Sequence, residues 1–163
     1  MAPVGKRTGA ELANDPLIAK FPNLARGGYR STSPATGQYN CFAWAVERTD
    51  VWVDPYRPDG FWPADLPEEL TLATVTGFYR RHGYEPCGAS VLESGFEKIA
   101  IYTDLSGIPT HAARQLESGT WTSKLGEHID IEHVDPAALT GQEYGAPILY
   151  MRRRRPDRSW IAL

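Results

Sequence analysis

Cysteine is scarce in this chain of 163 residues, which contains only Cys41 and Cys87. Two cysteines cannot build the disulfide framework of a small secreted protein. The chain also lacks an apolar run long enough to span a bilayer, and its N-terminus lacks the apolar run of a secretory signal. We therefore expect two reduced thiols in a cytoplasmic protein; delivery by a dedicated secretion system would need no such signal.

The chain also lacks an excess of positive charge, because the formal net charge is -3 at pH 7. The one basic run, Arg152–Arg155 with Arg158, is interpreted as the solvated end of a strand followed by a frayed tail. No glycine-rich phosphate loop follows a predicted strand. We accordingly expect no nucleic acid, no nucleotide and no membrane among the partners of this chain.

The remaining composition is that of a folded protein. Hydrophobic residues make up 42% and charged residues 23% of the chain, close to the average for globular domains. The length is that of one domain with a sizeable core, so we expect residues 1–163 to form a single domain.

Helical patterns come first along the chain, and strand patterns follow. A helix is expected over 9–20, a loop over 26–39, a helix capped by Asn40, and a helix over 67–82 stopped by Gly83. Strands are expected over 98–103, 110–116, 120–125 and 146–151, with a hairpin turn at 117–119 and one helical turn at 136–139. This order predicts an α+β fold with an antiparallel sheet.

Cys41 and His111 are the residues with the clearest chemical potential. Cys41 follows the N-cap Asn40, where unpaired backbone N–H groups and the positive end of the helix dipole stabilise a thiolate. His111 begins a strand that we expect to pack against that helix, and a neutral imidazole there can accept the thiol proton. The pair therefore indicates nucleophilic catalysis by a thiol.

The segments around these two residues resemble a known superfamily. Asn40-Cys41-Phe42-Ala43-Trp44-Ala45, followed by Thr110-His111-Ala112-Ala113, is similar to the papain-like cysteine peptidases and amidases, especially the NlpC-type branch. The stretches 111–116 and 121–126 also resemble an uncharacterised bacterial domain family. The resemblance implies a papain-like fold, with N-terminal helices and the cysteine helix packed on an antiparallel sheet, and implies Cys41 as nucleophile and His111 as base.

The third catalytic residue stays open at this point. The NlpC-type pattern points to Ser123, while Asp130 is the stronger electrostatic partner and His133 is a further option. Gln38 is a candidate for the oxyanion hole, together with the Cys41 N–H. The remaining candidates for contacts with the substrate are Asn40, Trp44, Trp62 and Lys124.

Three alternatives accompany this hypothesis. The first is a zinc site built from the chain's thiols and imidazoles, although no tight metal-binding spacing is present: Cys41, Cys87, His111, His128 and His133. The second is a Cys41–Cys87 disulfide. The third is a catalytically inactive module that binds a protein partner through the aromatic, proline-rich loop 51–63.

Taken together, the sequence predicts a thiol-dependent hydrolase or transferase acting on an amide, isopeptide or ester bond. We expect no cofactor and no metal. The expected substrate is a peptide, a protein, or a small amide or ester.

Overall fold

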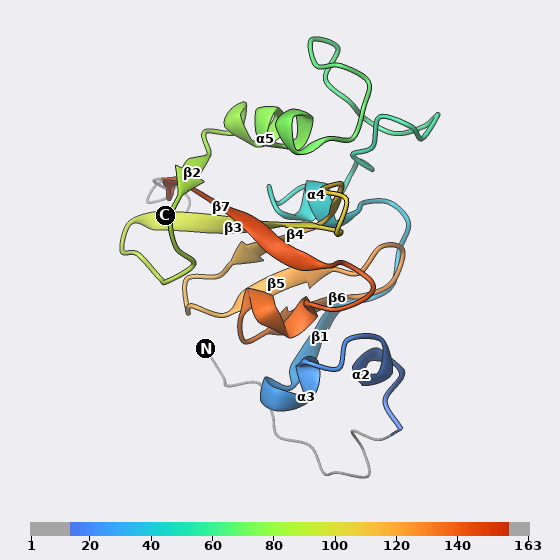
Figure 1. Cartoon of the computed structure of the whole chain (residues 1–163), viewed down its shortest axis with the longest axis vertical. Helices are drawn as coiled ribbons and strands as arrows, with labels where there is room; N and C mark the ends of the chain where they lie inside the picture. Colours follow the sequence, from blue (N-terminus) through green and yellow to red (C-terminus); the bar gives the residue numbers. More distant parts are fainter. Residues whose placement is uncertain (1–13, 157–163) are drawn as a thin grey trace, which may run out of the picture.

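The computed structural model describes residues 14–156, and these form one seven-stranded sheet (Figure 1). The strand order is β1-β6-β5-β4-β3-β7-β2, and every pair of neighbours is antiparallel. The strands are β1 (Tyr29–Ser33), β2 (Glu85–Cys87), β3 (Phe96–Thr103), β4 (Pro109–Gln115), β5 (Trp121–Lys124), β6 (Asp130–His133) and β7 (Ala146–Arg154). The helices are α2 (Pro16–Lys20), α3 (Leu24–Gly27), α4 (Cys41–Trp44), α5 (Leu72–Arg80) and the 3₁₀ turn η1 (Pro136–Leu139).

Short hairpins connect the central strands. The β4–β5 turn closes through a hydrogen bond from the Leu116 N–H to the Thr120 carbonyl at 2.8 Å. Gly119 in this turn has a φ of 96°, a conformation that a residue with a Cβ rarely adopts. The predicted hairpin over 110–125 is therefore confirmed, as are the strands over 98–103 and 146–151 and the turn at 136–139.

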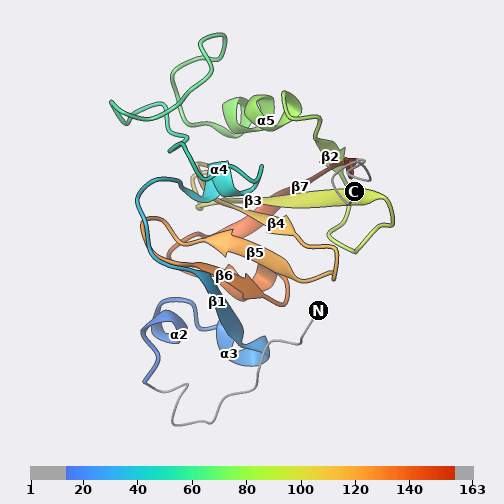
Figure 2. The same cartoon turned by 180° about the vertical axis from the view of Figure 1, so that it is seen from behind.

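Side chains alternate between two cores, one on each face of the sheet. One core contains Ile99, Ile101 and Ala112 and is covered by α4 and α5. The other contains Ala100, Tyr102 and Ala113 and is covered by the α2–α3 segment and by η1. Figures 1 and 2 show these helices from opposite sides of the molecule. The sheet is thus buried on both faces, which explains why β3, β4, β5 and β6 contain almost no exposed residue.

The expected papain-like fold is wrong. The structure is β-rich, and apart from α5 the helices are only four or five residues long. A strand, β1, precedes the cysteine helix in the segment expected to be a loop, and α4 is a single turn. β1 is an edge strand with a largely exposed face, so its polar residues carry little of the hydrophobic alternation that marks a strand.

The helix boundaries also differ from expectation. Residues 9–13 of the first expected helix lie outside the described residues, while α2 covers its end and stops at Lys20, as predicted. α5 begins at Leu72 instead of residue 67, because Thr71 and Thr74 form a capping box there. Among residues 14–156 no helix is long and apolar enough to cross a membrane.

The arginine run is part of the fold. Arg152, Arg153 and Arg154 belong to β7, and Arg158 lies outside the described residues. Arg153 pairs with the buried Glu97 at 2.5 Å, and Arg152 bonds to Glu93. The expected solvated, frayed strand end is therefore wrong for Arg152 and Arg153, because carboxylates on neighbouring segments match their charges.

Candidate functional site

Cys41 occupies the first position of α4, as the sequence predicted. The Asn40 side chain caps the helix by accepting a hydrogen bond from the Ala43 N–H at 3.2 Å. The same side chain donates to the Val53 carbonyl at 2.8 Å and accepts from the Val53 N–H at 3.1 Å. Asn40 therefore anchors the start of α4 to the loop that follows it, through both the oxygen and the nitrogen of its amide.

The Cys41 sulfur faces backbone N–H groups from two elements. The N–H groups of Cys41 and Phe42 come from the helix start, and the N–H of Ala112 comes from β4. β3 lies along the other edge of β4, and β5 pairs with β4 only at Arg114 and Gln115. The N–H groups of a strand lie in the plane of the sheet. The sulfur therefore lies at the open edge of β4, in the split where β5 diverges.

The Cys41 thiol is protonated in the resting protein. Burial raises its pKa to about 12, against the lowering effect of the three N–H groups and of the Lys124 ammonium. Any nucleophilic chemistry at this sulfur consequently requires a base that removes the proton during the reaction.

His111 lies on the strand that the sulfur touches. Its partner across the β3–β4 pair is Tyr102, whereas Ala112 pairs with Ile101 under α4. The imidazole therefore leaves β4 on the face away from α4. It contacts the Tyr102 ring at 5.1 Å and stacks on the Tyr144 ring at 4.2 Å with an interplanar angle of 5°.

The His111 ring has no hydrogen bond. It is fully buried, and within the described chain neither Nδ1 nor Nε2 has a partner. Burial, and then the nearby His133, hold the pKa of His111 well below its usual value, so the imidazole is neutral and able to accept a proton. The structure thus brings Cys41 to the strand of His111 without a hydrogen bond between the two side chains.

A small cavity of about 190 Å³ opens beside the thiol. Cys41, Thr110 and Tyr144 are among its walls, along with Trp52, Leu70 and Gly126. Thr110 holds the Tyr144 segment by donating from Oγ1 to the Tyr144 carbonyl at 2.5 Å. Tyr144 therefore forms a shared wall, with the Cys41 cavity lined by it and the His111 ring stacked on it.

The candidate third residues fall on both faces of the sheet. Ser123 Oγ and His133 Nε2 lie 2.8 Å apart on the face of His111, and His133 Nδ1 lies 2.8 Å from the Asp135 carbonyl. Neither residue is hydrogen-bonded to His111. Burial lowers the pKa of His133 to about 4, so this ring is also neutral.

Asp130 lies on the other face, the face that α4 covers. It accepts hydrogen bonds from the Tyr39 hydroxyl at 2.6 Å and from Thr32. Across the β5–β6 pair it faces Lys124, a fully buried residue whose Nζ donates to the Thr36 carbonyl at 2.8 Å and also to Gly126. Asp130 therefore supports a buried cation beside the thiol and is not placed to orient His111.

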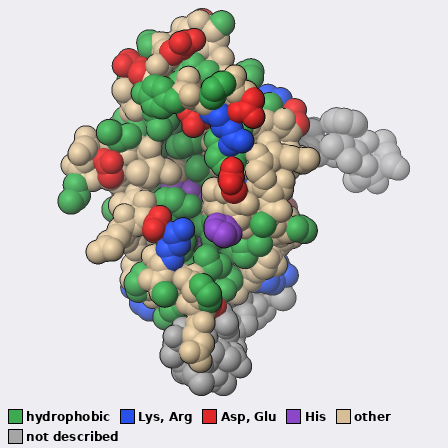
Figure 3. Space-filling view, turned by 90° about the vertical axis from the view of Figure 1, so that its right-hand side faces the viewer, with side chains coloured by type: hydrophobic (Ala, Val, Ile, Leu, Met, Phe, Trp, Pro, Cys, Tyr) green, Lys and Arg blue, Asp and Glu red, His purple; other side chains and the backbone are tan. Residues whose placement is uncertain are grey.

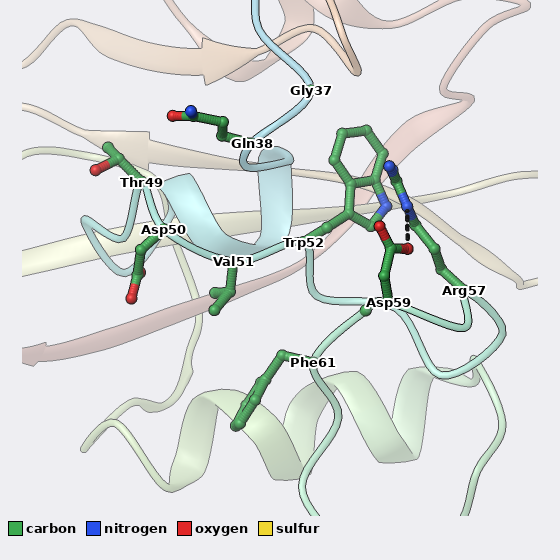
Figure 4. Close-up of a pocket in the computed structure, with 10 residues that line it drawn as sticks. Gly37, Gln38, Thr49, Asp50, Val51, Trp52, Arg57, Asp59 and Phe61 are labelled. Atoms are coloured by element: carbon green, nitrogen blue, oxygen red, sulfur yellow. Dashed lines mark hydrogen bonds and ion pairs between the residues drawn. The ribbon is translucent and has the colours of Figure 1, made fainter.

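Of the predicted contact residues Asn40 lines the cavity, whereas Gln38, Trp44 and Trp62 lie outside it. Trp44 donates from Nε1 to Thr122 Oγ1 at 2.9 Å, and Trp62 donates to the Pro67 carbonyl at 2.9 Å. Gln38 lines a separate surface groove of about 630 Å³ with Trp52 and Phe61, and in Figure 4 its side chain points away from Trp52. Gln38, Trp44 and Trp62 are therefore not among the residues that surround the sulfur.

The metal and disulfide alternatives find no assembled site. Within residues 14–156 no group of three or more His, Cys, Asp or Glu side chains is arranged to hold a metal ion. Cys41 and Cys87 are both free thiols, Cys41 buried and Cys87 partly exposed.

Tyr144 and Thr110 are the wall residues that sequence reasoning missed. Thr110 adjoins His111 in the chain, so its proximity was readable from the sequence. Tyr144 is placed by Gly145, which has a φ of 73° and lies so close to β3 that an added Cβ would stand 1.9 Å from the Thr103 carbonyl oxygen. The Tyr-Gly pair was the only signal in the sequence for this close approach.

Residues 30–152 match the model of a domain family described as a domain of unknown function (DUF7689). The chain belongs to this family. The matched DUF7689 range includes every residue of the site described above, from Gln38 to Tyr144. The match agrees with the resemblance to an uncharacterised family, and it gives no support to a papain-like or NlpC-type assignment. No curated protein and no solved structure matches the chain.

Proposed function

We infer that this protein is a thiol-dependent hydrolase or transferase that acts on an amide, isopeptide or ester bond. One observation carries the inference: the Cys41 sulfur, at a helix start, faces three backbone N–H groups at an open strand edge. The strand that donates one of them also bears a neutral, unpaired imidazole. Helix-start N–H groups favour a thiolate and a developing oxyanion.

The reaction begins with both groups neutral. The thiol proton passes to His111 as the sulfur attacks the carbonyl carbon, and the carbonyl electrons move to an oxyanion held by the helix-start N–H groups. The C–N or C–O bond then breaks, and the imidazolium returns the proton to the leaving amine or alcohol. Water, or an amine in a transferase, attacks the thioester, gives a proton to His111, and releases the acyl group and the thiol.

Proton transfer requires the two side chains to meet in the split between β4 and β5. Side chains from both faces of the sheet can reach a sulfur atom at the edge of β4. A sulfur atom above one face could be reached only from that face. His111 loses no hydrogen bond when its ring turns towards the sulfur, because both nitrogens are unpaired. An imidazole nitrogen then accepts its first hydrogen bond from the Cys41 thiol.

Lys124 is the electrostatic support for this chemistry. Its ammonium lowers the pKa of Cys41, and burial in turn lowers the pKa of Lys124. Asp130 opposes that second effect, because its charge favours the charged form of the lysine. A fixed cation near the sulfur stabilises negative charge on the thiolate and on the tetrahedral intermediate.

Acylation by p-nitrophenyl acetate tests the proposal. We expect release of p-nitrophenolate together with an acetyl group on Cys41, located by mass spectrometry and removed by hydroxylamine. Cys41→Ser abolishes this adduct, and Cys87→Ser is the matched control that retains it. Acetylation confined to Cys87, or equal at both cysteines in the native protein, would contradict a nucleophilic role for Cys41.

A binding module without chemistry is the second candidate, and the groove in Figure 4 favours it. There the Arg57 guanidinium lies 4.3 Å from the Trp52 ring and bonds to Asp59 at 2.8 Å, so an aromatic ring and a charged pair line the groove, as would suit a protein partner. A partner identified by crosslinking at this groove would bind Cys41→Ala normally and Trp52→Ala weakly. Loss of that binding in Cys41→Ala would contradict the module.

A further inference from the structure

A second, larger hollow lies next to the Cys41 cavity. Its volume is about 980 Å³, and the β3–β4 turn, the 140–145 segment and the start of α5 form its walls. The apolar side chains around it are Leu72, Leu105 and Ile148, and the last two are 109% and 61% exposed. Figure 3 shows the end of the molecule where the turn and the segment lie, with hydrophobic side chains interspersed with charged ones on this face.

Two segments connect this hollow to the thiol. Leu70 lines the Cys41 cavity and Leu72 lines the hollow, so the residues before and at the start of α5 span both. Tyr144 lines the cavity, and its neighbour Gly145 lines the hollow. The close packing of Gly145 against Thr103 fixes the second of these boundaries.

The chemistry of the hollow suits an uncharged occupant. Asp104 is the one charged residue among those that line it. Its carboxylate accepts hydrogen bonds from the backbone N–H groups of Ser106 and Ile108 at 2.9 and 3.0 Å. These bonds stabilise the β3–β4 turn. No Lys, Arg or His is among the residues that line the hollow, and the Asp104 carboxylate is already hydrogen-bonded. Binding in the hollow is therefore favoured mainly by burial of apolar surface.

We propose that this hollow is a substrate subsite for an apolar group that lies next to the scissile carbonyl. The inference rests on the proposed thiol chemistry at Cys41. The group is an aliphatic chain or an apolar amino-acid side chain, because both bury the same kind of surface against Leu72, Leu105 and Ile148. The subsite explains why bulky apolar side chains remain exposed at this end of the sheet.

Alkylation of Cys41 by matched probes tests the subsite. Three iodoacetamides share one reactive group: the parent compound, the N-hexyl derivative, and a derivative of equal length ending in a carboxylate. Cys87 in the same chain is the internal reference for intrinsic probe reactivity, and peptide mass spectrometry gives the rate at each cysteine. We expect the hexyl probe to favour Cys41 over Cys87 by about tenfold more than the parent does, which corresponds to burial of roughly two methylene groups. The carboxylate probe gives no such gain.

Variants locate the effect. Ile148→Asp removes most of the hexyl preference, and Leu105→Ser is a second variant in case the strand substitution disturbs folding. Val91→Asp is the matched control, since Val91 is 68% exposed and lies outside the hollow. A probe derived from leucine amide, compared with the hexyl probe, distinguishes a peptide side chain from an aliphatic chain.

The outcomes separate the two proposals. If the parent compound labels Cys41 but the hexyl probe gives no gain, the subsite is overturned and the thiol chemistry stands. A gain that survives both Ile148→Asp and Leu105→Ser also overturns the subsite. If no probe labels Cys41, the thiol proposal fails, and binding of N-hexylacetamide is then measured by NMR. Saturable methyl shifts of Leu105 and Ile148 in the native protein, with loss of the Leu105 shift in Ile148→Asp, support the subsite, and absence of these shifts in the native protein refutes it.

Discussion

Replacement of His111 by phenylalanine separates a catalytic role for this residue from a structural one. The phenyl ring keeps the stack on Tyr144 and the contact with Tyr102, but it cannot accept a proton. Among residues 14–156 neither imidazole nitrogen has a hydrogen-bond partner, so the substitution breaks no hydrogen bond there.

The expected change in stability is small. A buried polar group without a partner costs about 1–3 kcal/mol, and the substitution removes this cost. The larger ring adds an overpacking penalty of about 1–3 kcal/mol. We therefore expect the free energy of unfolding of His111→Phe to lie within about 1 kcal/mol of the native value at pH 7. His133→Phe is the matched control, because it breaks contacts with Ser123 and the Asp135 carbonyl and should lose about 2–4 kcal/mol.

The expected change in rate is large. With a pKa of about 12, thiolate makes up on the order of 10⁻⁵ of Cys41 at pH 7. An unassisted thiol therefore reacts faster by tenfold for each pH unit. A thiol assisted by neutral His111 reacts at a rate that is nearly independent of pH above the low pKa of that imidazole. General base catalysis contributes about 10²–10⁴-fold, so His111→Phe should slow acylation at pH 7 by about that factor.

The assay is the rate of Cys41 acylation by p-nitrophenyl acetate between about pH 6 and pH 9 in a Cys87→Ser background. The native protein should give a flat profile, and His111→Phe a profile with a slope near one. Urea unfolding of the same samples gives the stability. A unit slope in the native protein, or an unchanged rate in His111→Phe, would refute His111 as the base. A rate loss accompanied by a large loss of stability would assign the residue a structural role.

Three further predictions follow from the surroundings of this pair. Lys124→Met should slow acylation of Cys41 without changing the slope of the pH profile, because it removes a cation that lowers the thiol pKa. Gly145→Ala should lower the free energy of unfolding by about 2–4 kcal/mol in urea, because a Cβ would stand 1.9 Å from the Thr103 carbonyl oxygen; Gly88→Ala, with open space around it, should change it by less than about 0.5 kcal/mol. His133 has its pKa lowered to about 4, so the folded state binds fewer protons than the unfolded state, and stability should fall by roughly 3 kcal/mol as the pH drops from about 6.5 to 4. Acid titrations by circular dichroism should show this loss in the native protein and a smaller one in His133→Gln.

The sequence predicted the elements that bury both faces of the sheet. The strand β3 and the β4–β5 hairpin were found because apolar residues and a glycine turn mark them clearly. β1 and β6 were missed, since Arg30, Asp130 and Glu132 give these strands a polar pattern. The buried Glu132 bonds to Arg30 across the β1–β6 pair at 2.5 Å, so the apparent loop signal is an ion pair inside the sheet.

The candidate site was predictable only where it depends on local structure. Asn40 and Cys41 were placed correctly, because an N-cap and the residue after it follow from a few neighbouring residues. Tyr144 was not, since its position depends on the contact of Gly145 with a strand some forty residues earlier in the chain. Gln38 lines the groove of Figure 4 and not the Cys41 cavity, because its nearness to Cys41 in sequence does not bring its side chain to that cavity.

The contrast between the two buried histidines is the strongest argument for function at this end of the sheet. His133 has partners at both nitrogens, Ser123 and the Asp135 carbonyl, as a histidine kept for stability should have. His111 is equally buried and has none. A phenylalanine at position 111 would fill the same stack without the desolvation penalty, so packing alone does not account for an imidazole there. The proposed role of proton acceptor would account for it, because the partner of the ring would then be the thiol proton of Cys41.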